Sequence, residues 1–267
     1  EHGLNDFELG MNVQKELTKR FTSEFGIRFF ILADSKKALS ILKDWADDPN
    51  YHVRRLVSEG SRPRLPWGMQ LTEFVKNPDP LFPILEALKD DPEEYVRRSV
   101  ANNLNDIAKD HPGKVAKTAK AWMKDASPQR QKLVRHACRT LIKQGHKATL
   151  SALGYTAPKV SLKSLEVSTP VVQFGDALHF DIAIKSTGSK DQDLIIDYIV
   201  HHRKASGKTT PKVFKWKNLT LKKGQSLKAA RKHTIKPITT RTYYAGTHMV
   251  EILINGEKFG QAAFELQ

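Results

Sequence analysis

The first half of the chain carries apolar residues at the spacing of amphipathic helices. Leu9, Val13, Leu17 and Phe21 follow one another at intervals of four residues, which places them along one side of a helix. A second such segment begins after Asp34, whose side chain can cap the first turn of a helix. These patterns predict a helical region.

A repeated motif organises that region. The segment DPNYHVRRLVSE (48–59) is echoed by DPEEYVRRSVAN (91–102), with 43 residues between Pro49 and Pro92. A looser third copy, SPQRQKLVRHACRTL, occupies residues 127–141. A period of about 40 residues is typical of HEAT-like helical pairs, which stack on one another into a solenoid.

The second half follows the pattern of β-strands. The segment LHFDIAI (178–184) alternates between apolar and polar residues, as a half-buried strand does. Further strand-like runs follow, and Asn255-Gly256 lies between two of them, where both residues tolerate the positive φ of a hairpin turn. About seven short strands are typical of an immunoglobulin-like sandwich.

This change of pattern divides the chain into two predicted domains. We expect an all-α HEAT-like helical solenoid over residues 1–155 and an all-β immunoglobulin-like sandwich over residues 156–267. The boundary is expected near Gly154–Pro158.

The charge of the chain indicates a polyanionic partner. There are 44 Lys+Arg against 29 Asp+Glu, which gives a formal net charge of +15 and a pI near 9.8. A membrane surface is the weaker alternative, because the sequence has neither a long apolar run nor a lipidation signal. Cys138 is the single cysteine and lies on the apolar side of its predicted helix, which favours a reduced compartment, the cytoplasm, and a packing role. The histidines show no paired metal-ligand spacing, so we expect neither a metal nor a cofactor.

Acidic residues stand among the arginines of the repeats. Helical geometry places Glu59, Asn102 and Asp106 on equivalent flanks of neighbouring repeats. The arginines that border that surface are Arg54, Arg55, Arg97, Arg98, Arg135 and Arg139. Together with Arg62 and Arg64 they are the candidate phosphate-binding arginines of this half.

Simpler interpretations of these residues stay open at this point. Arg55 and Glu59 have the i,i+4 spacing of a surface ion pair. Asp106 could be a solvated or capping acid, and Glu24 could pair with Arg20 or Arg28.

Trp67 is the other unusual residue, because Pro63 and Pro66 exclude a helix around it. It either fills a gap between repeats or forms a flat apolar wall beside the cationic groove. Carboxylates in such a groove weaken phosphate binding, but they can stabilise a developing oxocarbenium ion and hold the attacking water during cleavage of an N-glycosidic bond. A cationic alkylated base would also be attracted to the acids and to an indole face.

Two blocks of the sequence carry a resemblance to a known family. VRRLVSEGSRPRLPWG (53–68) followed by VRRSVANNLNDIAKDHP (96–112), ahead of a strand-rich domain, resembles the AlkC branch of the HEAT-like bacterial DNA glycosylases, which are related to AlkD. The resemblance covers nearly the whole chain and implies that the family's first helices lie before Glu1.

The resemblance implies a monofunctional DNA glycosylase that excises N3-alkylated bases, chiefly 3-methyladenine and 3-methylcytosine, from double-stranded DNA without flipping the base. It further implies Glu24, Glu59 and Asp106 as catalytic acids, Trp67 as the aromatic wall, and a sandwich that helps to encircle the duplex. Lys208, Lys212, Arg231 and Lys232 are the candidate DNA contacts of the sandwich. We expect a monomer.

Two alternatives remain. The first is a non-catalytic HEAT-repeat scaffold that binds nucleic acid through the arginines, and the second is a solenoid that binds an acidic protein.

Overall fold

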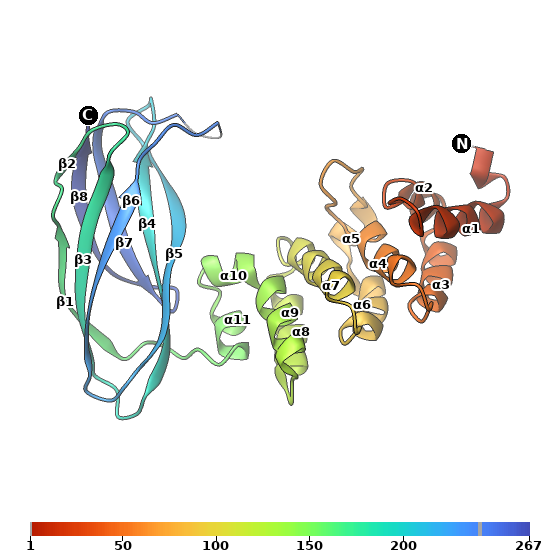
Figure 1. Cartoon of the computed structure of the whole chain (residues 1–267), viewed down its shortest axis with the longest axis horizontal. Coiled ribbons are helices and arrows are strands. Elements are labelled where there is room, and N and C mark those ends of the chain that lie inside the picture. Colours follow the sequence, from red (N-terminus) through yellow and green to blue (C-terminus); the bar gives the residue numbers. More distant parts are fainter. Residues whose placement is uncertain (1, 240–241) are drawn as a thin grey trace. The chain divides into compact units, whose positions relative to one another are not determined.

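The computed structural model describes residues 2–239 and 242–267. The chain divides into two compact units, residues 1–141 and residues 142–267, and each is described by itself (Figure 1). None of the helices in the described ranges is long and apolar enough to cross a membrane.

The first unit is helical, as the sequence predicts. Two single 3-10 turns, η1 (His2–Leu4) and η2 (Asp79–Leu81), accompany its helices. The helices are α1 (Phe7–Thr18), α2 (Ile27–Ala33), α3 (Ser35–Trp45), α4 (Tyr51–Gly60), α5 (Thr72–Lys76), α6 (Phe82–Leu88), α7 (Glu94–Ile107), α8 (Pro112–Met123), α9 (Pro128–Ala137) and the first residues of α10 (Arg139–Lys143).

The sequence pattern predicts the start of α3 and the presence of α1, but it does not predict which side chains of α1 are buried. The Asp34 carboxylate accepts a hydrogen bond from the backbone N–H of Lys37 and caps α3, as expected. The apolar stripe Leu9, Val13 and Leu17 does lie on α1, but these side chains are about half exposed. The periodicity therefore predicts this helix correctly without identifying a face buried in this chain.

The three copies of the repeated motif occupy three helices that pack in series. α4 packs against α7, and α7 packs against α9. Each helix buries its motif valine, Val53, Val96 and Val134, together with the apolar residues one turn away. Cys138 directly follows α9, is fully buried, and has its thiol pKa raised to about 12 by that burial. Its packing role is therefore confirmed.

The change from helix to strand comes after α11 (Lys147–Ala152), which belongs to the second unit. The compact second unit thus begins at Ile142, whereas the boundary expected from the sequence falls between α11 and the first strand. Within this unit Gly145 and Gly256 approach so closely that a Cβ added at either residue would lie within 3.0 Å of the other's backbone. The segment before the strands is therefore seated on the sandwich.

The strands form the two sheets of an immunoglobulin-like sandwich. They are β1 (Val160–Val167), β2 (Val171–Val172), β3 (Ala177–Ser186), β4 (Gln192–Arg203), β5 (Thr209–Leu221), β6 (Ser226–Thr234), β7 (Gly246–Ile254) and β8 (Glu257–Leu266). One sheet has the order β1-β3-β6 and the other the order β2-β8-β7-β4-β5. Neighbouring strands pair antiparallel except for β2 and β8, which pair parallel.

Alternating residues of the strands fill the core between the sheets. Leu178, Phe180, Ile182 and Ile184 of β3 are all buried, so the alternation predicted for this segment is confirmed. Asn255 and Gly256 join β7 to β8 with φ values of 46° and 76°, which confirms the hairpin turn as well.

Candidate active site

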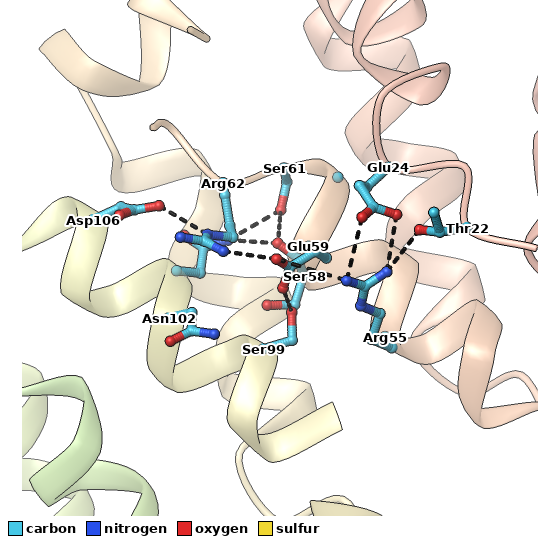
Figure 2. Close-up of polar contacts among 12 residues, drawn as sticks. Thr22, Glu24, Arg55, Ser58, Glu59, Ser61, Arg62, Ser99, Asn102 and Asp106 are labelled. Carbon is cyan, nitrogen blue, oxygen red and sulfur yellow. Dashed lines mark hydrogen bonds and ion pairs between the residues drawn. The ribbon is translucent and has the colours of Figure 1, made fainter. Parts of the chain in front are cut away.

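Three acidic and two basic side chains alternate across the helical unit (Figure 2). Arg55 donates to the Glu24 carboxylate at 3.0 Å and lies 3.7 Å from the nearer oxygen of Glu59. Arg62 donates to Glu59 at 2.7 Å and to Asp106 at 2.8 Å. The charges therefore run acid, base, acid, base, acid, and each carboxylate has a guanidinium beside it.

This row of charges is buried because each acid sits where a helix meets its neighbour. Glu59 lies in the last turn of α4, Asp106 in the last turn of α7, and Glu24 in the turn that precedes α2. All three acids are less than 9% exposed. The Ser99 hydroxyl, on the face of α7 that packs against α4, donates to the second oxygen of Glu59 at 2.6 Å. Lys109 donates to the outer oxygen of Asp106 at 3.0 Å and is itself exposed.

Arg62 is the cation that lies between Glu59 and Asp106 and pairs with both. Burial alone would lower the pKa of its guanidinium, but the hydrogen bond with Asp106 and the charges of Glu59 and Asp106 raise that pKa above its usual value. A buried cation held between two carboxylates stays charged.

The local pairings differ from the simplest expectations. Glu24 pairs with Arg55, not with Arg20 or Arg28, because Arg55 projects from α4 toward the turn before α2. Arg55 and Glu59 do face each other at i,i+4 spacing, but both are mostly buried and belong to the larger row. Asp106 is 2% exposed, so it is not a solvated acid.

Asn102 occupies the position of Glu59 in the next repeat but has different partners. Its side-chain oxygen accepts from Arg139 at 3.1 Å and lies 3.2 Å from the ring of His136. Figure 2 shows it beside Ser99 without a bond to either acid. Of the three residues expected on one flank, the structure joins Glu59 to Asp106 through Arg62 and leaves Asn102 beside them.

Trp67 stands at the tip of the loop between α4 and α5. Its side chain is 99% exposed and its φ is 61°, a left-handed conformation that residues other than glycine rarely adopt. The indole therefore does not fill a gap between the repeats of this unit. It is presented to solvent.

Two arginines expected to bind phosphate instead hold the start of their own repeats. Arg54 donates to the carbonyls of Asp48 and Pro49 and forms a two-pronged ion pair with Asp91. Arg97, its equivalent in the next repeat, donates to the carbonyls of Asp91 and Pro92. The first arginine of each Val-Arg-Arg motif thus stabilises the Asp-Pro turn before its helix.

The other candidate arginines of this unit differ in how far they are available. Arg64 forms a two-pronged pair with Asp110, and Arg139 is half-buried against Asn102. Arg98 and Arg135 are exposed. Arg98, Lys132 and His136 line an open hollow of about 340 Å³ beside α7 and α9.

The candidate DNA-binding residues of the sandwich also differ in their exposure to solvent. Lys208, Lys212 and Lys232 are exposed. Arg231 is half-buried, and its guanidinium carbon lies 5.5 Å from the centre of the Tyr198 ring in the core. Arg231 is therefore a packing residue at the edge of the core as much as a surface cation.

The sequence patterns did not identify two buried residues, Ser99 and Arg28, as partners within this unit. Ser99 was not considered, although it lies seven residues before Asp106 and so on the same side of α7. Arg28 was noted only as a partner for Glu24, but its place within the apolar segment IRFF was a signal that its cation is buried. Within the described ranges, no group of three or more His, Cys, Asp or Glu side chains could hold a metal ion.

This arrangement can act on a positive charge. The side chains of Glu59 and Asp106 are held in place by Arg62 and largely shielded from water, so electrostatic interactions at this site are weakly screened. An exposed indole offers a flat face to a cation or a base. These are groups that stabilise a developing cation, and none of them is suited to act as a nucleophile toward a carbonyl or a metal-bound substrate.

Both units of the chain are similar to known proteins. Residues 23–141 match the family described as DNA alkylation repair enzyme, and residues 161–267 match the C-terminal Ig-like domain of the uncharacterised protein YhaZ. YhaZ of Bacillus subtilis is 40% identical over 258 residues, which cover 96% of this chain and 71% of that protein.

A solved structure is similar along the whole chain. The alkylpurine DNA glycosylase AlkC of Pseudomonas fluorescens, bound to DNA that contains an abasic site analog, matches with a TM-score of 0.94 and 40% identity. The match covers 99% of this chain and 74% of that one. With a buried row of paired charges in its helical unit and an Ig-like domain that follows it in sequence, the chain belongs to the DNA alkylation repair enzyme family.

Proposed function

We propose that this protein is a monofunctional DNA glycosylase that hydrolyses the N-glycosidic bond of N3-alkylated bases, 3-methyladenine and 3-methylcytosine, in duplex DNA. The observation that carries the proposal is the buried row in which Glu59 and Asp106 share Arg62, in the same helical unit as the exposed indole of Trp67. Membership of the DNA alkylation repair enzyme family and the likeness to AlkC support it.

Each residue has a role in this proposal. Glu59 and Asp106 stabilise the oxocarbenium-like sugar electrostatically, and one of them orients the attacking water. Glu24 supports them through Arg55, which lies between Glu24 and Glu59. Trp67 forms a wall for the alkylated base, whose positive charge favours an aromatic face. An N3-alkylated base already carries that charge, so it leaves without a strong general acid.

The exposed position of Trp67 supports excision without base flipping. Enzymes that flip a base enclose it in a deep pocket between aromatic or apolar side chains. Here the indole projects 99% exposed from a loop, which suits contact with a nucleotide that stays within the duplex.

The remaining parts of the proposal concern the assembly on DNA. The helical unit is a HEAT-like solenoid in which α4, α7 and α9 are equivalent helices of successive repeats. Arg98, Arg135, Lys208, Lys212 and Lys232 contact phosphates from the two units, and the protein acts as a monomer. Arg54, Arg62 and Arg97 hold the site in shape instead of contacting DNA.

Removal of one acid tests the proposal directly. Glu59→Gln and Asp106→Asn keep the shape of the side chain and remove its charge, so each variant is expected to release 3-methyladenine from methylated duplex about 100-fold more slowly or worse. Duplex binding should be retained or tightened, because a negative charge leaves a cationic surface. Single-turnover release of free base measures the rate, and fluorescence anisotropy measures binding.

A matched control separates this effect from a general change of charge. Asp110→Asn removes an acid that pairs with Arg64 on the surface four residues after Asp106, so base release should stay close to that of the wild type. Wild-type rates in both Glu59→Gln and Asp106→Asn would refute the catalytic assignment. The alternative, a non-catalytic HEAT scaffold, predicts that the wild-type protein itself releases no base.

A further inference from the structure

Arg28 is a fully buried cation, and its hydrogen-bond partners within the described ranges are backbone carbonyls and not an acid. It lies in α2, and its side chain is 0% exposed. One terminal nitrogen donates to the carbonyls of Gly60 and Arg62, each at 2.8 Å. Its Nε donates to the carbonyl of Met69 at 2.8 Å, and its second terminal nitrogen donates to the same oxygen. The guanidinium thus joins the two ends of the loop that carries Trp67.

The first part of the loop has other anchors, because Arg62 pairs with Glu59 and Asp106, Arg64 pairs with Asp110, and Leu65 is buried. In the second part, Pro66, Trp67 and Met69 are exposed. The backbone bonds of the loop include Gly68 N–H to Leu65 O at 3.2 Å and Leu71 N–H to Pro63 O at 3.1 Å. Trp67 is almost completely exposed, so its side chain gains no packing that could hold it in place. The direction of the indole is therefore set by its backbone.

The contacts of Arg28 are stronger than ordinary turn bonds. Hydrogen bonds from a charged donor are about twice as strong as neutral ones, and these lie where water does not compete. Burial and the nearby charge of Arg62 lower the pKa of Arg28 to about 10, so the guanidinium remains charged at neutral pH. Gly68 lies directly against this side chain, since a Cβ added there would meet Arg28 Nε at 3.5 Å.

We propose that Arg28 is a positioning residue that holds the loop of residues 61–69 closed and so fixes the direction of the exposed Trp67 indole before DNA is bound. The part of the proposal that concerns base release rests on the proposed function, whereas the part that concerns the loop stands without it. Fixing a group in its working position removes the entropy cost of ordering it during the reaction.

Arg28→Lys is the informative substitution. Lysine keeps the positive charge, but its single ammonium cannot reach carbonyls on both sides as a planar fork does. The loop should then open at one end while the remainder of the core keeps its packing.

The first test uses the protein alone. The chain has four tryptophans, so incorporation of 5-fluorotryptophan gives a fluorine NMR spectrum in which Trp67→Phe identifies the Trp67 signal by its loss. In Arg28→Lys the Trp67 signal should shift or broaden, while the signals of Trp45, Trp122 and Trp216 stay in place. Arg130→Lys, which changes an arginine paired with Asp90 on the surface, serves as the control and should move none of the four.

The second test is a double-mutant cycle on base release. Arg28→Lys should slow single-turnover release by about 10- to 100-fold, the range expected when a catalytic group is misplaced by about an ångström. In a Trp67→Phe background the same substitution should cost less than about threefold, because two changes that act through one group are not additive.

The outcomes are distinct. A Trp67 signal that Arg28→Lys leaves unchanged overturns the proposal, as does a change of all four signals, because Arg28 would then support the core in general. An additive cycle shows that Arg28 does not act through Trp67 and also overturns it. If the wild type releases no base, the proposed function fails, and the fluorine spectrum still decides whether Arg28 holds the loop.

Discussion

The two units use their positive charges in opposite ways. In the helical unit Arg54, Arg55, Arg62 and Arg64 all form ion pairs with acids of the same unit. In the sandwich the candidate lysines stand exposed on strands and turns. The comparison shows that a count of basic residues does not measure a surface for phosphate, because part of the charge holds the protein and its site together.

The buried polar groups of the two units also differ, in how many of them have a hydrogen-bond partner. The helical unit surrounds its buried charges with partners, as Arg28, Glu59 and Asp106 show. In the sandwich, His202 lacks a hydrogen-bond partner at either ring nitrogen and His233 lacks one at Nε2, among the described residues. The sandwich also pairs one buried acid, since Glu251 contacts His201 and Lys258, so the contrast concerns its buried histidines.

The largest expected effect comes from breaking a structural ion pair of the helical unit. Arg54→Ala leaves Asp91, whose side chain is 2% exposed, without its cation and should lower the free energy of unfolding by about 3–5 kcal/mol. Arg97→Ala removes only hydrogen bonds to two carbonyls and should cost about 1–2 kcal/mol. Urea unfolding followed by circular dichroism measures both, and equal losses would contradict the difference between the repeats.

The next effect concerns the neutral histidine of the sandwich. Burial, with the charges of Arg231 and Lys212, lowers the pKa of His233 from 6.5 to about 4. The unfolded chain binds this proton below about pH 6.5 and the folded chain only below about pH 4, so stability is lost as the pH falls through that window. The contribution is at most about 3 kcal/mol.

Urea midpoints at pH 7.5 and pH 5, read from the fluorine signal of Trp216 in β5, measure this loss. His233→Gln should flatten the pH dependence, whereas the exposed His179→Gln should leave it as in the wild type. A dependence that persists unchanged in His233→Gln would assign the acid sensitivity to another group.

The smallest effect tests which cations meet DNA. Lys212→Ala or Lys232→Ala should reduce the slope of log Kd against log salt concentration by about one for undamaged duplex. Arg64→Ala should reduce it less, because Arg64 already pairs with Asp110. Anisotropy titrations at several salt concentrations measure the slopes, and a larger change in Arg64→Ala would show that its pair opens on DNA.

The sequence was sufficient for the fold where periodicity and turn chemistry act locally. The repeated motif of a proline followed by Val-Arg predicted the three helices that pack in series, and Asn255-Gly256 predicted the last hairpin. These features depend on residues close in sequence, so no tertiary information was needed. The exposure of Leu9 and Val13 could not be predicted, because an apolar stripe does not state what packs against it.

The sequence predicted the acidic residues of the candidate site, but it did not predict which arginine pairs with each of them. Helical geometry placed Glu59 and Asp106 on one flank, but Arg62, which links them, was expected to bind phosphate. Arg62 follows α4, where the chain has left the helix and angular projection no longer applies. Side chains that meet through loops, such as Arg28 and the Trp67 loop, lie outside what periodicity can show.

The backbone of Trp67 implies a conflict between folding and activity. A non-glycine residue at a φ of 61° costs about 1–2 kcal/mol, and an indole 99% exposed recovers none of that cost by burial. Glycine at this position would make the free protein more stable. The tryptophan is therefore a residue that the folded state alone does not favour, and a screen for thermal stability would select against it.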